Sequence, residues 1–139
     1  MEPVGLGTDI IEISRIREVF ERYPRRFLER VYTPVERQRA AQLRDPTSFL
    51  AGRFAVKEAV LKMLGTGLRG GISWQDIHVL REATGAPRVL LGGRALSKAR
   101  ELSLGRILVS ISHGREHAVA QVLGFVGSPE KITYCEKTT

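Results

Sequence analysis

Charged residues interrupt an otherwise apolar segment at residues 54–67, which reads FAVKEAVLKMLGTG. Glu58 and Lys62 are four positions apart, so a helix places both side chains on one face. The carboxylate could bind a hard cation such as Mg²⁺, and the ammonium group could pair with a phosphate. The simpler interpretation is an exposed ion pair, worth about 0.2–0.5 kcal/mol. Spacing alone favours the ion pair, whereas the apolar neighbours argue against full exposure, and Lys57 has no evident role.

The same segment ends in the turn Gly65-Thr66-Gly67. Gly65 is typical of a helix C-terminus, because glycine adopts the left-handed backbone conformation without strain. The turn also offers backbone N–H groups and a hydroxyl group to a phosphate, although it is too short to be a P-loop. A helix C-terminus carries a partial negative charge, so Lys62 or a metal ion would have to attract such an anion.

Asp9 is an acidic residue within the apolar sequence GLGTDII, at residues 5–11. Burying an ionised carboxylate is costly unless it is paired or bound to a metal ion. The alternative is a solvated carboxylate at the end of a strand, and spacing alone favours this alternative. Gly5 and Gly7 predict that a ligand or another backbone segment approaches this strand closely.

His113 follows a predicted strand and lies near Ser110 and Ser112 in the sequence SISHGRE. A serine beside a histidine suggests a hydrolase, but no nucleophile-elbow motif surrounds the pair and no carboxylate completes a triad. A solvated loop histidine is the simpler interpretation. His78 and His117 lie within strand patterns, and both are interpreted as structural residues.

The hydrophobic pattern predicts an α+β fold with a largely antiparallel sheet, packed against a long central helix and shorter helices. Thr33, Pro34 and Glu36 form the capping-box start of one helix, and Pro24 ends or restarts an earlier one. The expected strands cover residues 4–13, 76–80, 87–91, 106–112 and 117–126. The expected helices run from residue 13, over 34–43, from 45 or 47 to 64, and over 93–103. We expect one domain over residues 1–126 and a polar, disordered tail over 127–139.

The chain is basic, with a net charge of +7 that is unevenly distributed. Eight arginines and four glutamates lie within residues 13–40, and this surface should attract polyanions or an acidic protein. A basic nucleic-acid-binding module is one interpretation, although the segment contains no recognised nucleic-acid motif.

Composition also limits the kinds of site and the cellular location. The single cysteine, Cys135, excludes an internal disulfide and fits the reducing environment of the cytoplasm. No cluster of Cys and His has zinc-site spacing, so a metal ion would be a hard cation held by carboxylates. No apolar run approaches the roughly 20 residues of a membrane-spanning helix, so no membrane partner is expected.

Three segments occur together in this sequence: GLGTDIIEISRI, FLAGRFAVKEAVLKMLGTG and VSISHGREHAVAQ. In this order and spacing they resemble the holo-acyl-carrier-protein synthase family, the short stand-alone group of 4′-phosphopantetheinyl transferases. The resemblance extends from about residue 4 to residue 123 and includes RVYTPVE and GAPRV. It implies the fold of that family and a role in fatty acid biosynthesis.

The resemblance also implies an activity and a set of site residues. The family transfers 4′-phosphopantetheine from coenzyme A to a serine of apo acyl carrier protein, releases adenosine 3′,5′-bisphosphate, and requires Mg²⁺. By resemblance, Asp9 and Glu58 bind the metal ion, Lys62 binds the diphosphate, and Arg53 binds the 3′-phosphate. The Gly65, Thr66 and Gly67 turn and His113 line the coenzyme pocket, and Glu58 is the candidate general base, either directly or through a metal-bound water.

Partners follow from the same resemblance. Acyl carrier proteins are acidic, and the family binds them on its first helical region, so the expected contacts are Arg15, Arg22, Arg25 and Arg26. The family forms homotrimers with active sites between subunits, so Asp9 and the helix of Glu58 are expected to come from different chains. Two alternatives remain open from the residues: the nucleic-acid-binding module, and a Mg²⁺-dependent phosphohydrolase with water as the acceptor.

Overall fold

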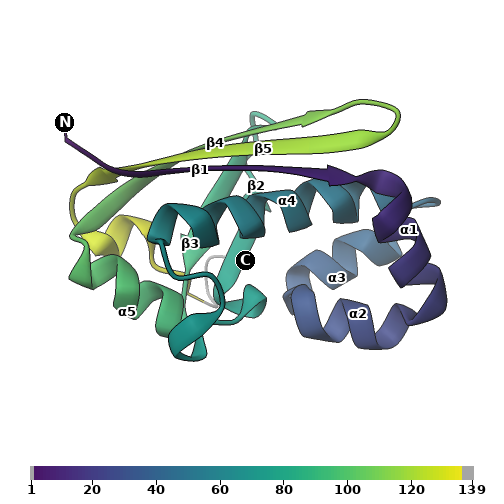
Figure 1. Ribbon diagram of the computed structural model, residues 1–139, viewed down its shortest axis with the longest axis horizontal. Helices are drawn as coiled ribbons and strands as arrows, with labels where there is room; N and C mark the ends of the chain where they lie inside the picture. Colours follow the sequence, from purple (N-terminus) through teal and green to yellow (C-terminus); the bar gives the residue numbers. More distant parts are fainter. Residues whose placement is uncertain (1, 136–139) are drawn as a thin grey trace.

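The computed structural model describes residues 2–135 and contains two antiparallel sheets, as Figure 1 shows. The larger sheet has the order β1-β5-β4 and consists of β1 (Pro3–Glu12), β4 (Leu104–His113) and β5 (His117–Val126). The smaller sheet is a hairpin of β2 (Ile77–Arg81) and β3 (Pro87–Leu91). The predicted α+β class and antiparallel pairing are confirmed, but the strands form two sheets.

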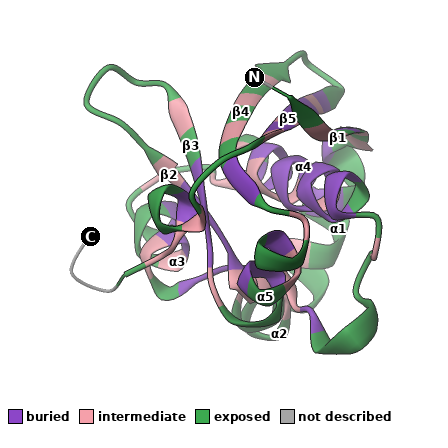
Figure 2. Ribbon diagram, turned by 90° about the vertical axis from the view of Figure 1, so that its left-hand side faces the viewer, coloured by how far each residue is buried: buried purple, intermediate pink, exposed green. Residues whose placement is uncertain are grey.

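One long helix, α4 (Thr47–Leu64), runs beneath the larger sheet and is buried over most of its length (Figures 1 and 2). The shorter helices are α1 (Ile13–Arg22), α2 (Pro24–Val31), α3 (Pro34–Ala41) and α5 (Gly93–Glu101). Within residues 2–135, short 3-10 helices cover Arg69–Gly71, Trp74–Asp76 and Pro129–Ile132. In Figure 1, α1, α2 and α3 gather near the start of α4, whereas α5 lies near its end.

The close approach of β1 to α4 depends on small residues. Ala55, Ala59 and Val60 of α4 are completely buried. Opposite them, a Cβ atom added to Gly7 would lie only 1.8 Å from the carbonyl oxygen of Ala59. Only glycine allows this contact, so the predicted close approach at Gly7 is to the backbone of α4, and it brings the next inward-facing residue, Asp9, beside this helix.

Local signals set the helix ends as the sequence predicts. Thr33 and Glu36 form the capping box of α3, with the Thr33 side chain accepting from the Glu36 N–H and the Glu36 carboxylate accepting from the Thr33 N–H. Pro24 begins a new helix, α2, immediately after Tyr23. Gly65 ends α4 with a left-handed backbone, at φ 77°.

The expectation of a disordered tail is wrong for residues 127–135. Ile132 is buried at 4% exposure, and Thr133 forms an isolated bridge with Leu91. The Tyr134 N–H donates to the Leu91 carbonyl at 2.8 Å, and the Tyr134 ring stacks on His78 with centroids 3.5 Å apart. Burial of one apolar side chain and one added backbone pairing hold this segment against β3. Residues 136–139 of the predicted tail lie outside the described residues.

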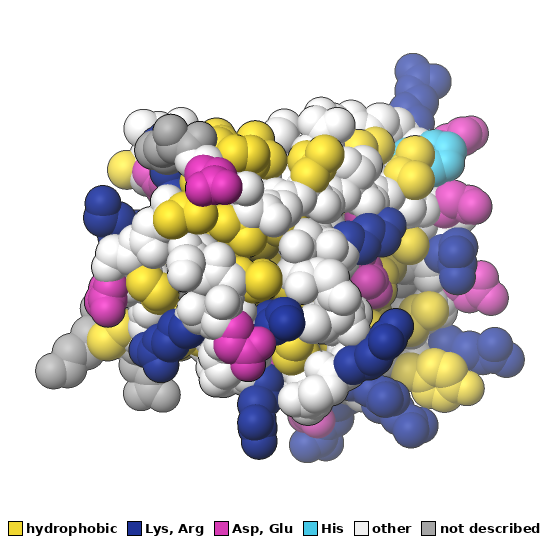
Figure 3. All heavy atoms as spheres, turned by 60° about the vertical axis from the view of Figure 1, so that its left-hand side comes forward, with side chains coloured by type: hydrophobic (Ala, Val, Ile, Leu, Met, Phe, Trp, Pro, Cys, Tyr) yellow, Lys and Arg dark blue, Asp and Glu magenta, His cyan; other side chains and the backbone are white. Residues whose placement is uncertain are grey.

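The outer face of the larger sheet is exposed and partly apolar. Leu6, Ile10 and Leu108 project from it with exposures of 66%, 62% and 45%. Figure 3 shows hydrophobic side chains along the top of the molecule, where Figure 1 places this sheet. In the part of the chain that the structure describes, no helix has the length and apolar character needed to cross a lipid bilayer.

Candidate active site

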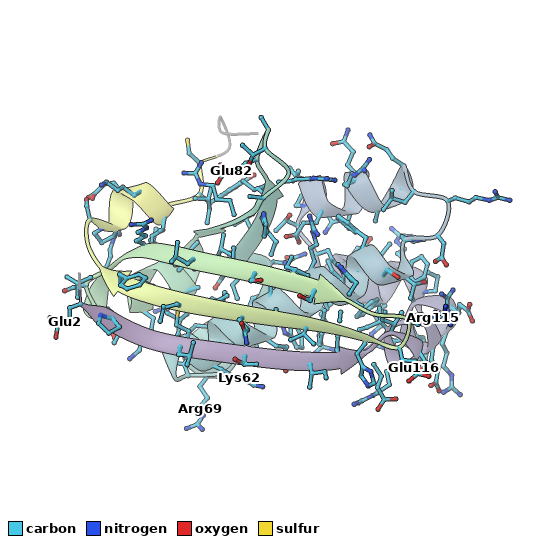
Figure 4. The ribbon with its side chains drawn as sticks, turned by 90° about the horizontal axis from the view of Figure 1, so that it is seen from above. Glu2, Lys62, Arg69, Glu82, Arg115 and Glu116 are labelled. Atoms are coloured by element: carbon cyan, nitrogen blue, oxygen red, sulfur yellow. The ribbon has the colours of Figure 1, made fainter. Side chains whose placement is uncertain are left out.

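Asp9 and Lys62 form an ion pair between β1 and the last turn of α4. The Lys62 Nζ atom lies 3.0 Å from Oδ1 of Asp9 and donates a second hydrogen bond to the Thr8 carbonyl at 2.9 Å. The Asp9 side chain is only 15% exposed, whereas that of Lys62 is 55% exposed. Figure 4 shows Lys62 at the β1 edge of the larger sheet. Asp9, whose burial as an unpaired carboxylate would cost free energy, is therefore paired with the Lys62 ammonium group.

Glu58 lies one turn before Lys62 on α4 and is half-buried. Its Oε1 atom accepts a hydrogen bond from the indole Nε1 of Trp74 at 3.3 Å. Burial raises the pKa of Glu58, the Trp74 hydrogen bond lowers it, the negative charge of Asp9 raises it, and Lys62 lowers it. The carboxylates of Asp9 and Glu58 are thus close enough to repel each other, and a cation bound between them would relieve that repulsion.

Asp9 and the helix of Glu58 were expected to come from different subunits, and the structure corrects this expectation. The pair between Asp9 and Lys62 joins β1 to α4 within one chain. The physical reason is Gly7, whose missing side chain lets β1 lie directly on Ala59 of α4.

The donor set at this position fits Mg²⁺ and does not fit a metal ion held by protein side chains alone. Among the described residues, no group of three or more His, Cys, Asp or Glu side chains could hold a metal ion. Asp9 and Glu58 provide two carboxylates. Mg²⁺ is bound in this manner in proteins, with one or two carboxylates, substrate phosphates and water completing its octahedron.

Arg53 and His113 lie together in a second location, a groove of about 600 Å³ that is lined by residues of α3, α4, β2 and β4. The groove also contains Arg39 and Arg81, so its walls carry several cationic groups. The guanidinium of Arg53 lies 4.4 Å from the Phe49 ring centroid. The ring nitrogen Nε2 of His113 lies 3.1 Å from the carbonyl oxygen of Ser48.

Arg53 is the cationic group of this groove with an unsatisfied donor. Within residues 2–135, its buried Nε atom has no hydrogen-bond partner. Burial lowers the pKa of Arg53, the charge of Glu36 raises it, and the like charges of Arg81 and Arg39 lower it further. A buried donor without a partner is costly, so an anion bound in this groove would satisfy Arg53.

The predicted site residues thus form two groups on opposite edges of the larger sheet. Asp9 belongs to β1 and His113 to β4, and β5 separates these strands. Neighbouring strands are about 4.8 Å apart, so the two edge strands are separated by roughly 10 Å. The turn of Gly65, Thr66 and Gly67 follows Lys62 at the end of α4, on the side of the first group.

The four predicted carrier-binding arginines are all exposed on α1 and α2: Arg15, Arg22, Arg25 and Arg26. Arg25 pairs with Glu29 at 3.0 Å within α2, and the guanidinium of Arg22 lies 5.9 Å from the Tyr23 ring centroid. Figure 3 shows Lys and Arg side chains projecting from the lower part of the molecule, where Figure 1 places α2 and α5.

Sequence reasoning missed the role of Lys57, which lies inside the protein. Its Nζ atom is 2.7 Å from Oε1 of Glu36, and both side chains are essentially unexposed. The same ammonium group donates to the carbonyl oxygens of Val31, Trp74 and Ile77 at 2.9, 3.1 and 2.8 Å. The available signal was the apolar surroundings of Lys57 in sequence, which indicate a buried position.

Comparison with known proteins identifies the class to which this fold and site belong. The family described as the 4′-phosphopantetheinyl transferase superfamily matches residues 5–122. The chain therefore belongs to this superfamily, and the predicted resemblance is confirmed.

Individual relatives narrow the comparison to one kind of transferase. The holo-(acyl-carrier-protein) synthase of Moorella thermoacetica is 51% identical over 117 residues, which cover 84% of this chain and 90% of the relative. The crystal structure of the holo-(acyl-carrier-protein) synthase of Neisseria meningitidis is 35% identical, with a TM-score of 0.81, covering 88% of this chain and 98% of that chain. The Bacillus anthracis synthase in complex with CoA (3′,5′-ADP) is 36% identical, with a TM-score of 0.77, covering 91% of this chain and 100% of that chain.

Proposed function

We propose that this chain is a Mg²⁺-dependent enzyme that transfers 4′-phosphopantetheine from coenzyme A to a serine of apo acyl carrier protein. The products are holo acyl carrier protein and adenosine 3′,5′-bisphosphate, and the reaction serves fatty acid biosynthesis in the cytoplasm. The observation that carries the proposal is the cluster of Asp9, Glu58 and Lys62, which places two carboxylates and one ammonium group together at the β1 edge.

Asp9 and Glu58 hold the metal ion in this proposal. When bound there, Mg²⁺ would supply positive charge that stabilises the negative charge developing on the leaving phosphate. Lys62, which pairs with Asp9 at 3.0 Å and has an exposed ammonium group, would bind the diphosphate of coenzyme A. The backbone N–H groups of Gly65 and Gly67 and the hydroxyl of Thr66 form part of the same pocket wall.

The transfer makes one P–O bond and breaks another. The serine oxygen of the carrier attacks the phosphorus nearest pantetheine, and adenosine 3′,5′-bisphosphate leaves with the electron pair of the broken bond. The serine must lose its proton during the attack. Glu58 is the candidate base, directly or through a water molecule, because its half-buried carboxylate belongs to the cluster that would hold the reacting diphosphate.

The adenosine end of coenzyme A binds in the groove of Arg53 and His113. Support comes from the unpartnered Nε of Arg53 and from the other cationic residues of the groove, Arg39 and Arg81. These groups suit the 3′-phosphate, which carries about two negative charges at neutral pH.

We also infer that the site is shared between subunits, with the two groups of one site coming from different chains. Asp9, Glu58 and Lys62 lie at the β1 edge, whereas Arg53 and His113 lie toward the β4 edge. In a homotrimer, the first group of one subunit and the second group of its neighbour bind the two ends of one coenzyme A. The exposed apolar face with Leu6, Ile10 and Leu108 supplies an apolar surface for such assembly.

The arginines of α1 and α2 bind the acidic carrier protein in this proposal. Arg15, Arg22, Arg25 and Arg26 are exposed, and opposite charge steers two proteins together before close contact forms.

Intact-mass spectrometry of an apo acyl carrier protein tests the proposed transfer. After incubation with coenzyme A and Mg²⁺, we expect a mass gain of one 4′-phosphopantetheine group and release of adenosine 3′,5′-bisphosphate. EDTA should prevent the gain, and added Mg²⁺ should restore it. Release of the nucleotide without a mass gain on the carrier would show water to be the acceptor and would identify a phosphohydrolase instead.

A further inference from the structure

Trp74 is the only tryptophan of the chain, and its indole N–H points at the carboxylate of Glu58. The Nε1 atom donates to Oε1 of Glu58 at 3.3 Å, although the two residues belong to different elements. We propose that Trp74 is a positioning residue that fixes the Glu58 carboxylate for metal binding. This inference rests on the proposed function, since it takes Asp9 and Glu58 as the metal-binding carboxylates.

The protein holds Trp74 firmly on its backbone side. The buried ammonium group of Lys57 donates to the Trp74 carbonyl at 3.1 Å and to the Ile77 carbonyl at 2.8 Å. Ser73 and Asp76 form a capping box around the short helix that contains Trp74. Two elements of the chain therefore fix the backbone from which the indole group extends.

The ring of Trp74 is held by aromatic packing. Its centroid lies 6.0 Å from that of Phe54, which belongs to α4 one turn before Glu58. The indole and the carboxylate that it contacts are thus placed by the same helix. An indole nitrogen can only donate, and a carboxylate can only accept, so this hydrogen bond has one possible direction.

The two carboxylate oxygens of Glu58 therefore have different roles in this proposal. The indole binds Oε1, which restricts rotation of the carboxylate and leaves Oε2 for a cation. A glutamate side chain that rotates freely loses conformational entropy when it binds a metal ion. The Trp74 hydrogen bond already restricts Glu58, so less entropy is lost when the metal ion binds. Groups that orient a metal ligand in this manner typically contribute about 10- to 100-fold to metal affinity or activity.

Two replacements of Trp74 remove the N–H group, and the second of them also keeps the size of the ring system. Trp74→Phe keeps an aromatic ring beside Phe54. Incorporation of 3-benzothienylalanine at position 74 keeps the fused ring system and replaces the N–H by sulfur, and the single tryptophan codon makes the replacement selective. The control is Phe27→Leu, which removes a ring packed 5.4 Å from Tyr32 and 6.5 Å from Phe54, between centroids, and leaves both Phe54 and the indole N–H in place.

The measurement is Mn²⁺ binding to the full-length enzyme saturated with coenzyme A, without carrier protein, followed by the electron paramagnetic resonance signal of free Mn²⁺. We expect both Trp74 variants to bind Mn²⁺ about tenfold more weakly than the wild type, and the 3-benzothienylalanine variant to keep the wild-type melting temperature. The Phe27→Leu control should lower the melting temperature and keep the Mn²⁺ affinity. In transfer assays, the Trp74 variants should need about tenfold more Mg²⁺ for half-maximal rate and keep most of kcat at saturating Mg²⁺.

Unchanged Mn²⁺ affinity in both Trp74 variants would overturn the inference. Loss of the folded state in both variants would also overturn it, because Trp74 would then be a core residue only. Asp9→Asn distinguishes this failure from failure of the proposed function. If the wild type binds Mn²⁺ no better than Asp9→Asn does, the metal site itself is wrong, and the role of Trp74 is withdrawn with it.

Discussion

The Nζ atom of Lys62 lies 3.0 Å from Oδ1 of Asp9, and this ion pair joins two residues that are 53 positions apart in the sequence. Lys62 thereby neutralises one of the two carboxylates proposed to bind Mg²⁺. The ammonium group and a metal ion would share Asp9 as a partner, so binding of the metal ion should release Lys62 for the diphosphate of coenzyme A.

Replacing Lys62 should affect metal binding and catalysis in opposite directions. In Lys62→Gln, Mg²⁺ no longer competes with an ammonium group for Asp9, so we expect metal affinity to rise about threefold or more. Transfer should fall by about 10- to 100-fold, because the diphosphate loses a charged partner. Calorimetric titration with Mg²⁺ and the intact-mass assay measure the two effects. If Lys62→Gln lost both metal affinity and transfer activity, the proposed competition between Lys62 and Mg²⁺ for Asp9 would be contradicted.

Removing the buried ammonium group of Lys57 should destabilise the fold strongly. Glu36 pairs with Lys57 at 2.7 Å, and both side chains are buried, so Lys57→Met leaves a buried carboxylate without its charge partner. We expect a loss of about 3–5 kcal/mol in the free energy of unfolding. Urea unfolding measures this loss. The control is Lys98→Met, which breaks the more exposed Lys98–Glu101 pair at 3.4 Å and should cost less than about 1 kcal/mol. Equal losses in the two variants would contradict the prediction.

Acid should weaken the fold partly through His78. Burial, with a further contribution from the charge of Lys57, lowers the pKa of His78 to about 4. The folded pKa lies below the ordinary value of 6.5, so the unfolded chain binds more protons between these two pH values, and stability falls as the pH drops through that window.

The matched variant is His78→Phe, which keeps an aromatic ring against Tyr134 and cannot titrate. Between pH 7 and pH 5, the wild type should lose up to about 2 kcal/mol more unfolding free energy than this variant. Urea unfolding at the two pH values gives the comparison. The same pH dependence in both proteins would show that the pKa of His78 is the same in the folded and unfolded states.

Charge reversal on the first helices should weaken recognition of the carrier protein. For Arg22→Glu with Arg26→Glu, we expect the KM for apo carrier to rise about tenfold or more and the KM for coenzyme A to stay constant. Raising the salt concentration should reduce the difference from the wild type, since exposed charges are screened. Arg94→Glu with Arg100→Glu on α5 reverses the same number of exposed charges elsewhere and serves as the control. If the control raised the KM for apo carrier equally, the effect would come from the net charge of the protein and not from α1 and α2.

Local sequence signals predicted the elements and the individual groups of the site. The capping box at Thr33, the helix end at Gly65 and the close approach at Gly7 each depend on neighbouring residues or on one missing side chain. The pattern of Asp9 within an apolar strand indicated that its carboxylate needed a partner. These signals concern one residue and its immediate surroundings, so they could be read without the fold.

The arrangement of the groups could not be predicted in the same way. Helix α4 is buried on most sides, so its hydrophobic pattern does not tell which face meets β1 and which meets β4. For that reason the sequence did not indicate that Arg53 and Asp9 lie in separate groups. Trp74 and Glu36 reach Glu58 and Lys57 from other elements, and such contacts depend on the packing of distant segments.

A complementation experiment tests most directly the claim that the two edges form one transferase site. Asp9→Asn damages the β1 edge, and Arg53→Gln with His113→Ala damages the groove. The two variants are co-expressed with different tags, and oligomers that contain both kinds of subunit are purified and assayed by the intact mass of the carrier protein. Each variant alone should transfer at roughly a hundredth of the wild-type rate or less.

The mixed oligomers should recover a substantial part of the wild-type rate, because some interfaces combine an intact β1 edge with an intact groove. Mixed oligomers that are as inactive as either parent would contradict a site built from two subunits.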